Sequence, residues 1–191
     1  MRLIGPADYR HMPWKNGGGT TIEIAVSLSG ASLETFDWRV SMATVVEAGP
    51  FSTFPGIDRT LCVLEGNGIR LDIDGQSTTL TQSSAPFAFA ADAKVLGMPL
   101  DGPITDLNVM TRRGRYRHAV SRMNAIRSLA VQPTGSTSLI FSCNACRIAS
   151  RAEMIDVPAG ASILIENDAG GSYEAAATGA VELFLVDLFA I

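Results

Sequence analysis

Short runs in which apolar and polar residues alternate follow one another along most of the chain. The run Ile69–Ile73 alternates in this way, meets the turn pair Asp74-Gly75, and returns through residues 77–81, which is typical of a β-hairpin. A period of two predicts strands with one buried face. Further runs with strand character cover residues 36–46, 59–64, 95–100, 104–111, 138–143, 147–150, 153–157, 161–166 and 180–188.

Many short strands at even spacing predict an all-β fold, either a sandwich or a small barrel. Residues 121–132 fit two interpretations, because Met123, Ile126 and Leu129 have helical spacing while residues 128–132 also suit a strand. No flexible linker interrupts the chain. We therefore expect two barrel-like halves, residues 1–120 with the pocket and residues 121–191, fused into one compact body.

The composition excludes several classes of protein. Of the 191 residues, 47% are apolar and 18% are charged, which is not the composition of a disordered chain. Folding a chain of this size buries about 70% of its surface, enough for a core without metal or disulfides. No apolar run approaches the roughly 18 residues of a membrane span, and the first residues do not resemble a signal peptide. We expect a soluble cytoplasmic protein with no membrane partner.

The three cysteines do not form a recognisable site. Cys143 and Cys146 make a single C-x-x-C pair, whereas a zinc site needs a second pair of ligands. A redox motif would require a turn into a helix, but the residues before Cys143 predict a strand. A structural role is therefore the preferred interpretation.

The glycine-rich segment 12–21 is the densest candidate for chemistry. It contains Trp14, Lys15 and Asn16 followed by three glycines, 17–19, whose backbone amides could cradle an anion. The segment matches neither a P-loop nor a dinucleotide fingerprint. Two interpretations stay open: a tight connection in which Trp14 fills the core, and a ligand-binding loop in which Lys15 and Asn16 take part.

The next candidate lies on the expected strand 36–46. Alternation places Arg39, Ser41 and Ala43 on one face, with Trp38 and its alternate neighbours on the other. If the first face lines the barrel, Arg39 is buried and needs an anionic partner. Either a carboxylate of the protein or the carboxylate of a bound molecule would satisfy it.

Two further segments place charged residues near the same strands. Asp58 and Arg59 are adjacent at the mouth of a strand, so at most one of them faces the cavity unless the turn bends. In the segment 106–113, one face carries Asp106, Asn108, Met110 and Arg112. Such a polar row fits either a polar barrel interior or a solvated edge.

Together these four segments resemble the HutD/Ves family of bacterial cupin-like proteins in order and spacing over residues 8–115. The resemblance implies a double cupin with an RmlC-like jelly-roll fold and one pocket in its N-terminal half. It also implies a small-molecule-responsive modulator linked to histidine utilisation, while the Ves branch is linked to stress induction.

Metal-binding cupins use a set of histidines and a glutamate, and this chain offers only His11 and His118. His118 lies in the arginine-rich segment 112–127, where a cation is disfavoured. We therefore expect no metal and no other cofactor. No Gly-x-Ser-x-Gly motif is present, and we assign no catalytic residue.

The prediction is a metal-free cupin-like protein that binds a small carboxylate metabolite, such as urocanate or formylglutamate, in its N-terminal half. The expected ligand-binding residues are Lys15, Asn16, Arg39, Ser41, Asp58, Arg59 and Asn108. One alternative is a metal-independent isomerase or hydrolase acting on a similar acid. Another is an interaction protein whose arginine-rich segment contacts an acidic partner or RNA, although the net charge of −4 disfavours nucleic acid. A homodimer stays open.

Overall fold

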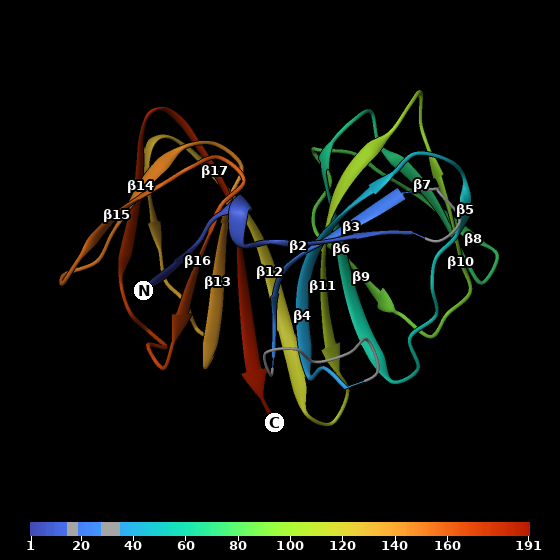
Figure 1. The fold of residues 1–191 in the computed structure, drawn as a ribbon, viewed down its shortest axis with the longest axis horizontal. Helices are drawn as coiled ribbons and strands as arrows, with labels where there is room; N and C mark the ends of the chain where they lie inside the picture. The colour runs from blue at the N-terminus through green and yellow to red at the C-terminus, as the bar shows by residue number, and fades with distance from the viewer. Residues whose placement is uncertain (15–18, 28–34) are drawn as a thin grey trace. The chain divides into compact units, whose positions relative to one another are not determined.

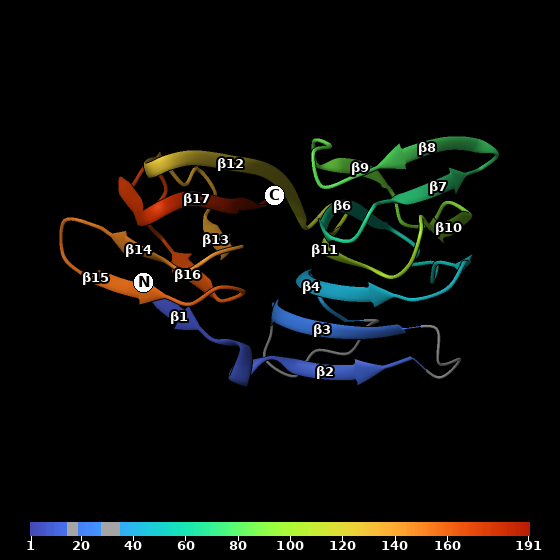
Figure 2. The same cartoon turned by 90° about the horizontal axis from the view of Figure 1, so that it is seen from above.

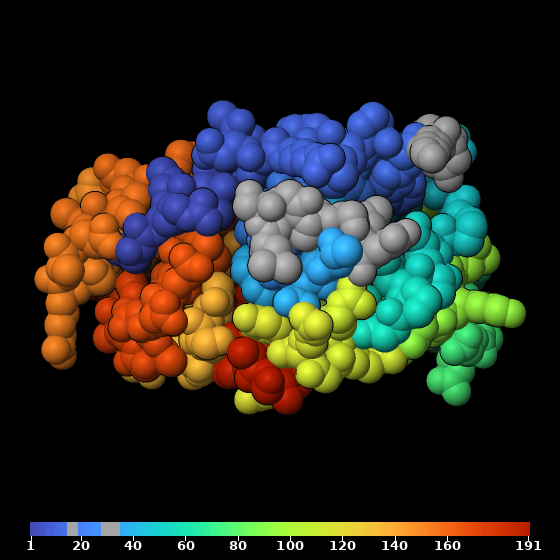
Figure 3. All heavy atoms as spheres, turned by 60° about the horizontal axis from the view of Figure 1, so that its bottom comes forward, coloured from blue at the N-terminus to red at the C-terminus, as the bar shows by residue number. Residues whose placement is uncertain are grey.

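The computed structural model describes residues 1–14, 19–27 and 35–191, which form β-strands and one 3-10 turn, η1 (Pro6–Asp8). The chain divides into two compact units, Arg10–Tyr116 and Met1–Tyr9 with Arg117–Ile191 (Figure 1). The expected halves differ from this division chiefly in the first nine residues. These belong to the second unit because β1 (Arg2–Ile4) pairs with β16 (Ser162–Glu166). In Figure 3 the first residues, in dark blue, lie against this orange-red segment.

The unit Arg10–Tyr116 contains two sheets (Figure 2). The six-stranded sheet has the order β2 (Arg10–Pro13), β3 (Gly19–Val26), β4 (Trp38–Val45), β11 (Ile104–Arg112), β6 (Ile57–Glu65) and β9 (Phe87–Ala90). The four-stranded sheet has the order β5 (Gly49–Pro50), β10 (Val95–Pro99), β7 (Ile69–Ile73) and β8 (Gln76–Leu80). The pairings in both sheets are antiparallel.

Apolar residues from both sheets of this unit form a common core. Val45, Leu61, Val63 and Ile104 come from the six-stranded sheet, and the four-stranded sheet contributes Ile69, Leu71, Leu80 and Val95. Burying these aliphatic side chains is the main favourable contribution to packing the sheets face to face. The sandwich predicted by strand alternation is therefore present in this unit.

The other unit is a single seven-stranded sheet. Its main path runs in the order β1, β16, β13 (Thr137–Ser142), β17 (Tyr173–Ala190), β14 (Cys146–Ala149) and β15 (Met154–Val157). The seventh strand, β12 (Tyr116–Val131), pairs with β17. The ambiguous residues 121–132 thus form a strand, with Met123 and Leu129 packed against the apolar core of the unit.

Five strands had not been expected from the pattern: β1, β2, β3, β5 and β9. The glycine-rich segment, interpreted as a loop, becomes β3 from Gly19 onward. A Cβ atom on Gly19 would lie 2.2 Å from the backbone oxygen of Thr44 and 3.0 Å from the Trp14 ring. Only glycine fits this close approach. The described end of the segment therefore serves packing, while residues 15–18 lie outside the described part of the chain.

Candidate functional site

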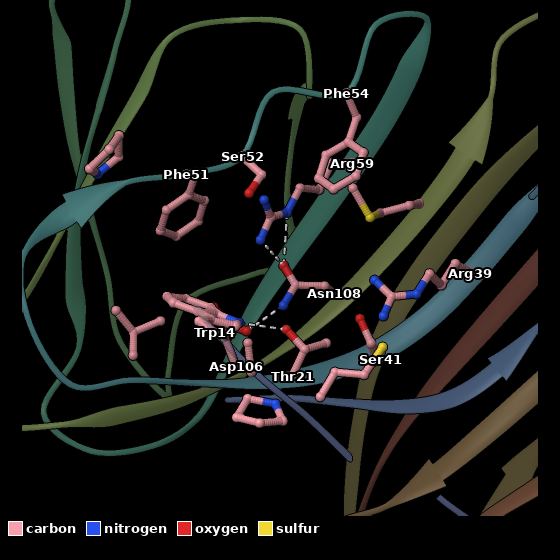
Figure 4. A pocket seen from close by; sticks show the side chains of 16 residues that line it. Trp14, Thr21, Arg39, Ser41, Phe51, Ser52, Phe54, Arg59, Asp106 and Asn108 are labelled. Atoms are coloured by element: carbon pink, nitrogen blue, oxygen red, sulfur yellow. Dashed lines mark hydrogen bonds between the residues drawn. The ribbon is translucent and has the colours of Figure 1, made fainter. Parts of the chain in front are cut away.

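The unit Arg10–Tyr116 contains a cavity of about 520 Å³, which is within the usual range of about 300–1,000 Å³ for small-molecule sites. Strands of the six-stranded sheet line it, together with the segment that follows β5. Figure 4 shows side chains from these elements converging on the space. The polar lining residues are Thr21, Arg39, Ser41, Ser52, Arg59, Asp106 and Asn108.

Strand register explains why these side chains meet. Across β4 and β11 the paired residues at the cavity are Arg39 with Met110, Ser41 with Asn108, and Ala43 with Asp106. Alternate residues of a strand share a face, so both strands present these positions to the same side. Of the two settings left open for the polar row of β11, the interior is therefore the one observed for residues 106, 108 and 110.

Arg39 is 5% exposed and has an anionic partner from the protein. Its Nε donates a hydrogen bond to Glu23 Oε2 at 2.7 Å. The Nη2 atom of the same guanidinium is buried and has no hydrogen-bond partner among the described residues. A protein carboxylate thus satisfies one side of Arg39, while the other retains an unused donor in a residue that lines the cavity.

Arg59, Asn108 and Asp106 form a buried relay along one side of the cavity (Figure 4). Arg59 donates from both Nε, at 2.8 Å, and Nη2 to Asn108 Oδ1. The Nδ2 of Asn108 in turn donates to Asp106 Oδ1. The guanidinium of Arg59 also lies over the ring of Phe51, 4.6 Å from its centroid, a cation–π arrangement. These contacts hold Asn108 with its oxygen toward Arg59.

Burial shifts the protonation equilibria of both ends of this relay. Burial away from solvent lowers the pKa of Arg59 to about 10, although the negative charge of Asp106 acts to raise it. Desolvation likewise raises the pKa of Asp106 to about 6, although Arg59 and Asn108 oppose the shift. Asp106 is fully buried, and its Oδ2 has no hydrogen-bond partner within the described residues. Perturbed carboxyl groups in a cavity are typical of functional sites.

Trp14 and Thr21 form the wall on the β2–β3 side. The indole Nε1 of Trp14 donates to Thr21 Oγ1 at 2.8 Å, and its backbone amide donates to Gly19 at 2.9 Å. Trp14 lines the cavity and also packs against the apolar core of the unit. The ligand roles predicted for Lys15 and Asn16 concern residues outside the described ranges.

Of the predicted ligand-binding residues, the structure brings Arg39, Ser41, Arg59 and Asn108 to the cavity. Asp58 is not among the residues that line the cavity, so the structure does not bring this predicted ligand-binding residue to it. Its side chain is 53% exposed and accepts a 2.6 Å hydrogen bond from Arg113 Nε. Strand alternation is the reason, because Arg59 turns inward and its neighbour must turn outward.

The acid that does face the cavity, Asp106, was not selected from the sequence as a ligand-binding residue. The signal for it was the same-face row with Asn108 and Met110, which identified the face but not its direction. Phe51 was also missed. It packs where Gly97 leaves room, since a Cβ on Gly97 would lie 2.5 Å from the Phe51 ring.

The described residues contain no cluster of side chains with the composition of a metal site. Among residues 1–14, 19–27 and 35–191, no three His, Cys, Asp or Glu side chains are grouped to hold an ion. Within the same ranges, no helix has the length and apolar character to cross a membrane.

The cysteines form no disulfide. Cys146 is buried with its Sγ 3.1 Å from Ser142 Oγ, and burial raises the pKa of its thiol.

Antiparallel strands enclosing a cavity of about 520 Å³ make this an all-β protein of the cupin class. A cupin 2 conserved barrel domain protein from Leptotrichia buccalis shares the fold, with a TM-score of 0.58 at 11% identity over 92% of this chain and 91% of that one. The predicted fold class is confirmed.

The chain belongs to the HutD family, whose sequence model matches residues 6–184. It is similar to the structure of HutD from Pseudomonas fluorescens SBW25, with a TM-score of 0.82 and 31% identity over 100% of this chain and 98% of that one. An uncharacterised 21.2 kDa protein in the hutC 3′ region of Pseudomonas putida is 39% identical over 75% of this chain and 74% of its own length. The predicted family is confirmed.

Proposed function

We propose that this chain binds a small carboxylate-bearing metabolite, without a metal, in the cavity of the Arg10–Tyr116 unit. The observation that supports this most is the unpartnered Nη2 of Arg39. Leaving a buried guanidinium N–H without an acceptor is costly, so an anionic oxygen at that position stabilises the protein. Carboxylates, like phosphates, are ionised oxygen groups to which a guanidinium donates its strongest hydrogen bonds.

The other lining groups would complete the binding. Arg59 adds a second buried positive charge, while its Nε and Nη2 already bond to Asn108. Ser41 is 2% exposed and offers a hydroxyl beside the path from Arg39 to Asn108. Lys15 and Asn16 stay part of the proposal as residues of the glycine-rich segment that adjoins Trp14.

The family context supports a biological setting for the ligand. The relatives are a HutD protein and a protein encoded beside hutC. We therefore place this chain in histidine utilisation as a cytoplasmic regulator or modulator, with intermediates such as urocanate and formylglutamate as the first ligands to test.

A thermal-shift screen tests the proposal, with each acid paired with its own methyl ester. A ligand at about 100 times its Kd stabilises the native state by about 2.7 kcal/mol, which for this chain length is roughly 5–11 °C in Tm. At least one acid should produce such a shift while its ester, lacking the carboxylate, should not. The proposal is wrong if no acid raises Tm, or if ester and acid act alike.

Asp106 supports one alternative, a metal-independent isomerase or hydrolase acting on a similar acid. A buried carboxyl group with a pKa of about 6 and a free oxygen is suited to act as a general base. Incubating the protein with each acid and following it by NMR separates the two functions. Turnover abolished by Asp106→Asn would establish the enzyme, and an unchanged acid supports binding alone.

A further inference from the structure

Two buried side-chain atoms of the described residues lack a hydrogen-bond partner, and both belong to residues that line the cavity. They are Arg39 Nη2 and Asp106 Oδ2. The first can only donate, and the second, on an ionised carboxyl group, can only accept. Buried polar atoms in folded proteins are almost always hydrogen-bonded. Two unpaired atoms on residues of one cavity, one a donor and the other an acceptor, are therefore unusual.

The orientation of Asp106 is fixed by its neighbours. Its Oδ1 accepts from Asn108 Nδ2, and the amide of Asn108 cannot turn over without giving up two hydrogen bonds from Arg59. The carboxyl group therefore keeps Oδ2 as its unused atom. Asp106 is fully buried and Arg39 is 5% exposed, so neither unpaired atom results from ordinary surface exposure.

The charges around the cavity are balanced. Arg39 pairs with Glu23 at 2.7 Å, and Arg59 is linked to Asp106 through Asn108. Two formal positive charges thus face two formal negative charges. A simple anion would satisfy Arg39 while leaving the buried Oδ2 of Asp106 without a donor. A ligand that also carries an N–H satisfies both atoms.

We infer that Asp106 Oδ2 is an acceptor subsite for a ligand N–H, so that the ligand class is a carboxylic acid with an N–H donor at its other end. The carboxylate half of this inference rests on the proposed function, and the N–H half rests on Asp106. Along β11, Asp106 lies four residues from Met110, the partner of Arg39. The backbone positions of Asp106 and Met110 are therefore about 13 Å apart along the strand, and the side chains extend from those positions. The two groups therefore belong at opposite ends of an extended molecule, with Asn108 and Ser41 between them (Figure 4).

Matched pairs of acids that differ only in the N–H test this inference. The probes are imidazole-4-acrylate (urocanate) against oxazole-4-acrylate, in which an oxygen replaces the ring N–H, and N-formylglutamate against its O-formyl ester counterpart. Titration calorimetry with the full chain at pH 8 gives each Kd. Loss of one hydrogen bond to a charged acceptor weakens binding roughly 10- to 100-fold, and that is the expected ratio for the favoured pair.

The variant Asp106→Asn tests whether the preference for the acid with an N–H comes from Asp106. Its amide oxygen can still accept from Asn108, but its NH2 then faces the ligand N–H, so the N–H acid should weaken at least about 10-fold while the acid lacking N–H changes little. Glu65→Gln, the same change at an exposed position of β6, should alter neither.

The outcomes separate the two claims. If neither member of either pair binds the wild-type chain, both the proposed function and this inference fail. If both members of a pair bind equally well, carboxylate binding stands and the N–H subsite is wrong. If Asp106→Asn does not fold, the comparison of paired acids on the wild-type chain decides alone.

Discussion

Replacing Arg39 with Met should destabilise the protein through a partner that the sequence did not reveal. The Nε–Oε2 bond to Glu23 is 2.7 Å long, with the two side chains 5% and 13% exposed. Removing one member of a buried ion pair costs about 3–5 kcal/mol, because the other charge is stranded away from water. Glu23 retains a little solvent, so we expect the lower end, about 3 kcal/mol. At roughly 2–4 °C per kcal/mol for a chain of this length, Tm should fall by about 6–12 °C.

A double-mutant cycle isolates the pair from the loss of packing. Arg39→Met and Glu23→Gln are measured singly and together by urea denaturation monitored by fluorescence. The double variant should be more stable than Arg39→Met, because the stranded carboxylate is gone, and the coupling energy should exceed about 1 kcal/mol. A coupling near zero, with Arg39→Met as stable as the wild type, would refute the buried ion pair.

Arg39→Lys separates the structural bond from the ligand bond. A lysine can still pair with Glu23 but has no second planar donor for a carboxylate. It should therefore keep most of the stability while weakening ligand binding roughly 10- to 100-fold. Arg70→Lys, the same change at an exposed arginine of β7, is the matched control and should alter neither stability nor binding.

Three further predictions follow from the cavity. Asn108→Ala removes the acceptor of two Arg59 hydrogen bonds, so the free energy of unfolding measured by urea denaturation should fall by about 1–3 kcal/mol. Asp58 lies outside the cavity, so Asp58→Asn should leave the ligand affinity measured by calorimetric titration unchanged. Because burial raises the folded-state pKa of Asp106 to about 6, above about 3.9 in the unfolded chain, the folded state binds the extra proton between these values. The contribution of Asp106 to the unfolding free energy should therefore fall by up to about 3 kcal/mol from pH 4 to pH 6, and Asp106→Asn should lose this component in unfolding curves measured across that range. Purified protein should carry less than about 0.1 equivalent of Fe, Zn, Ni or Mn by elemental analysis, because the ligand set of metal cupins is missing; near one equivalent, with stability lost on chelation, would contradict this.

The faces of β4 and β11 could be predicted from the sequence because a period of two is a local property of extended backbone. Arg39 and Ser41 share a face, as do Asp106 and Asn108, and all four line the cavity. The partner of Arg39 could not be predicted in the same way. Glu23 lies on β3, a strand that the pattern did not predict, and the two residues meet only through tertiary structure.

The choice of Asp58 over Asp106 has a similar cause. Alternation identifies which residues share a face but not which face is inside, and that depends on packing between sheets. For β12 the alternation of partly buried and exposed residues is itself interrupted. Its partly buried positions change from even to odd numbers between Arg122 and Met123, so the alternation slips and imitates helical spacing.

The central claim is that the cavity binds a carboxylate through the free side of Arg39. The most direct measurement is calorimetric titration of an acid selected by the thermal-shift screen into the wild type and into the variant that combines Arg39→Met with Glu23→Gln. That variant removes the guanidinium without leaving a stranded carboxylate. We predict saturable one-to-one binding to the wild type and at least about 10-fold weaker binding to the variant. Equal affinity for both proteins would contradict the account.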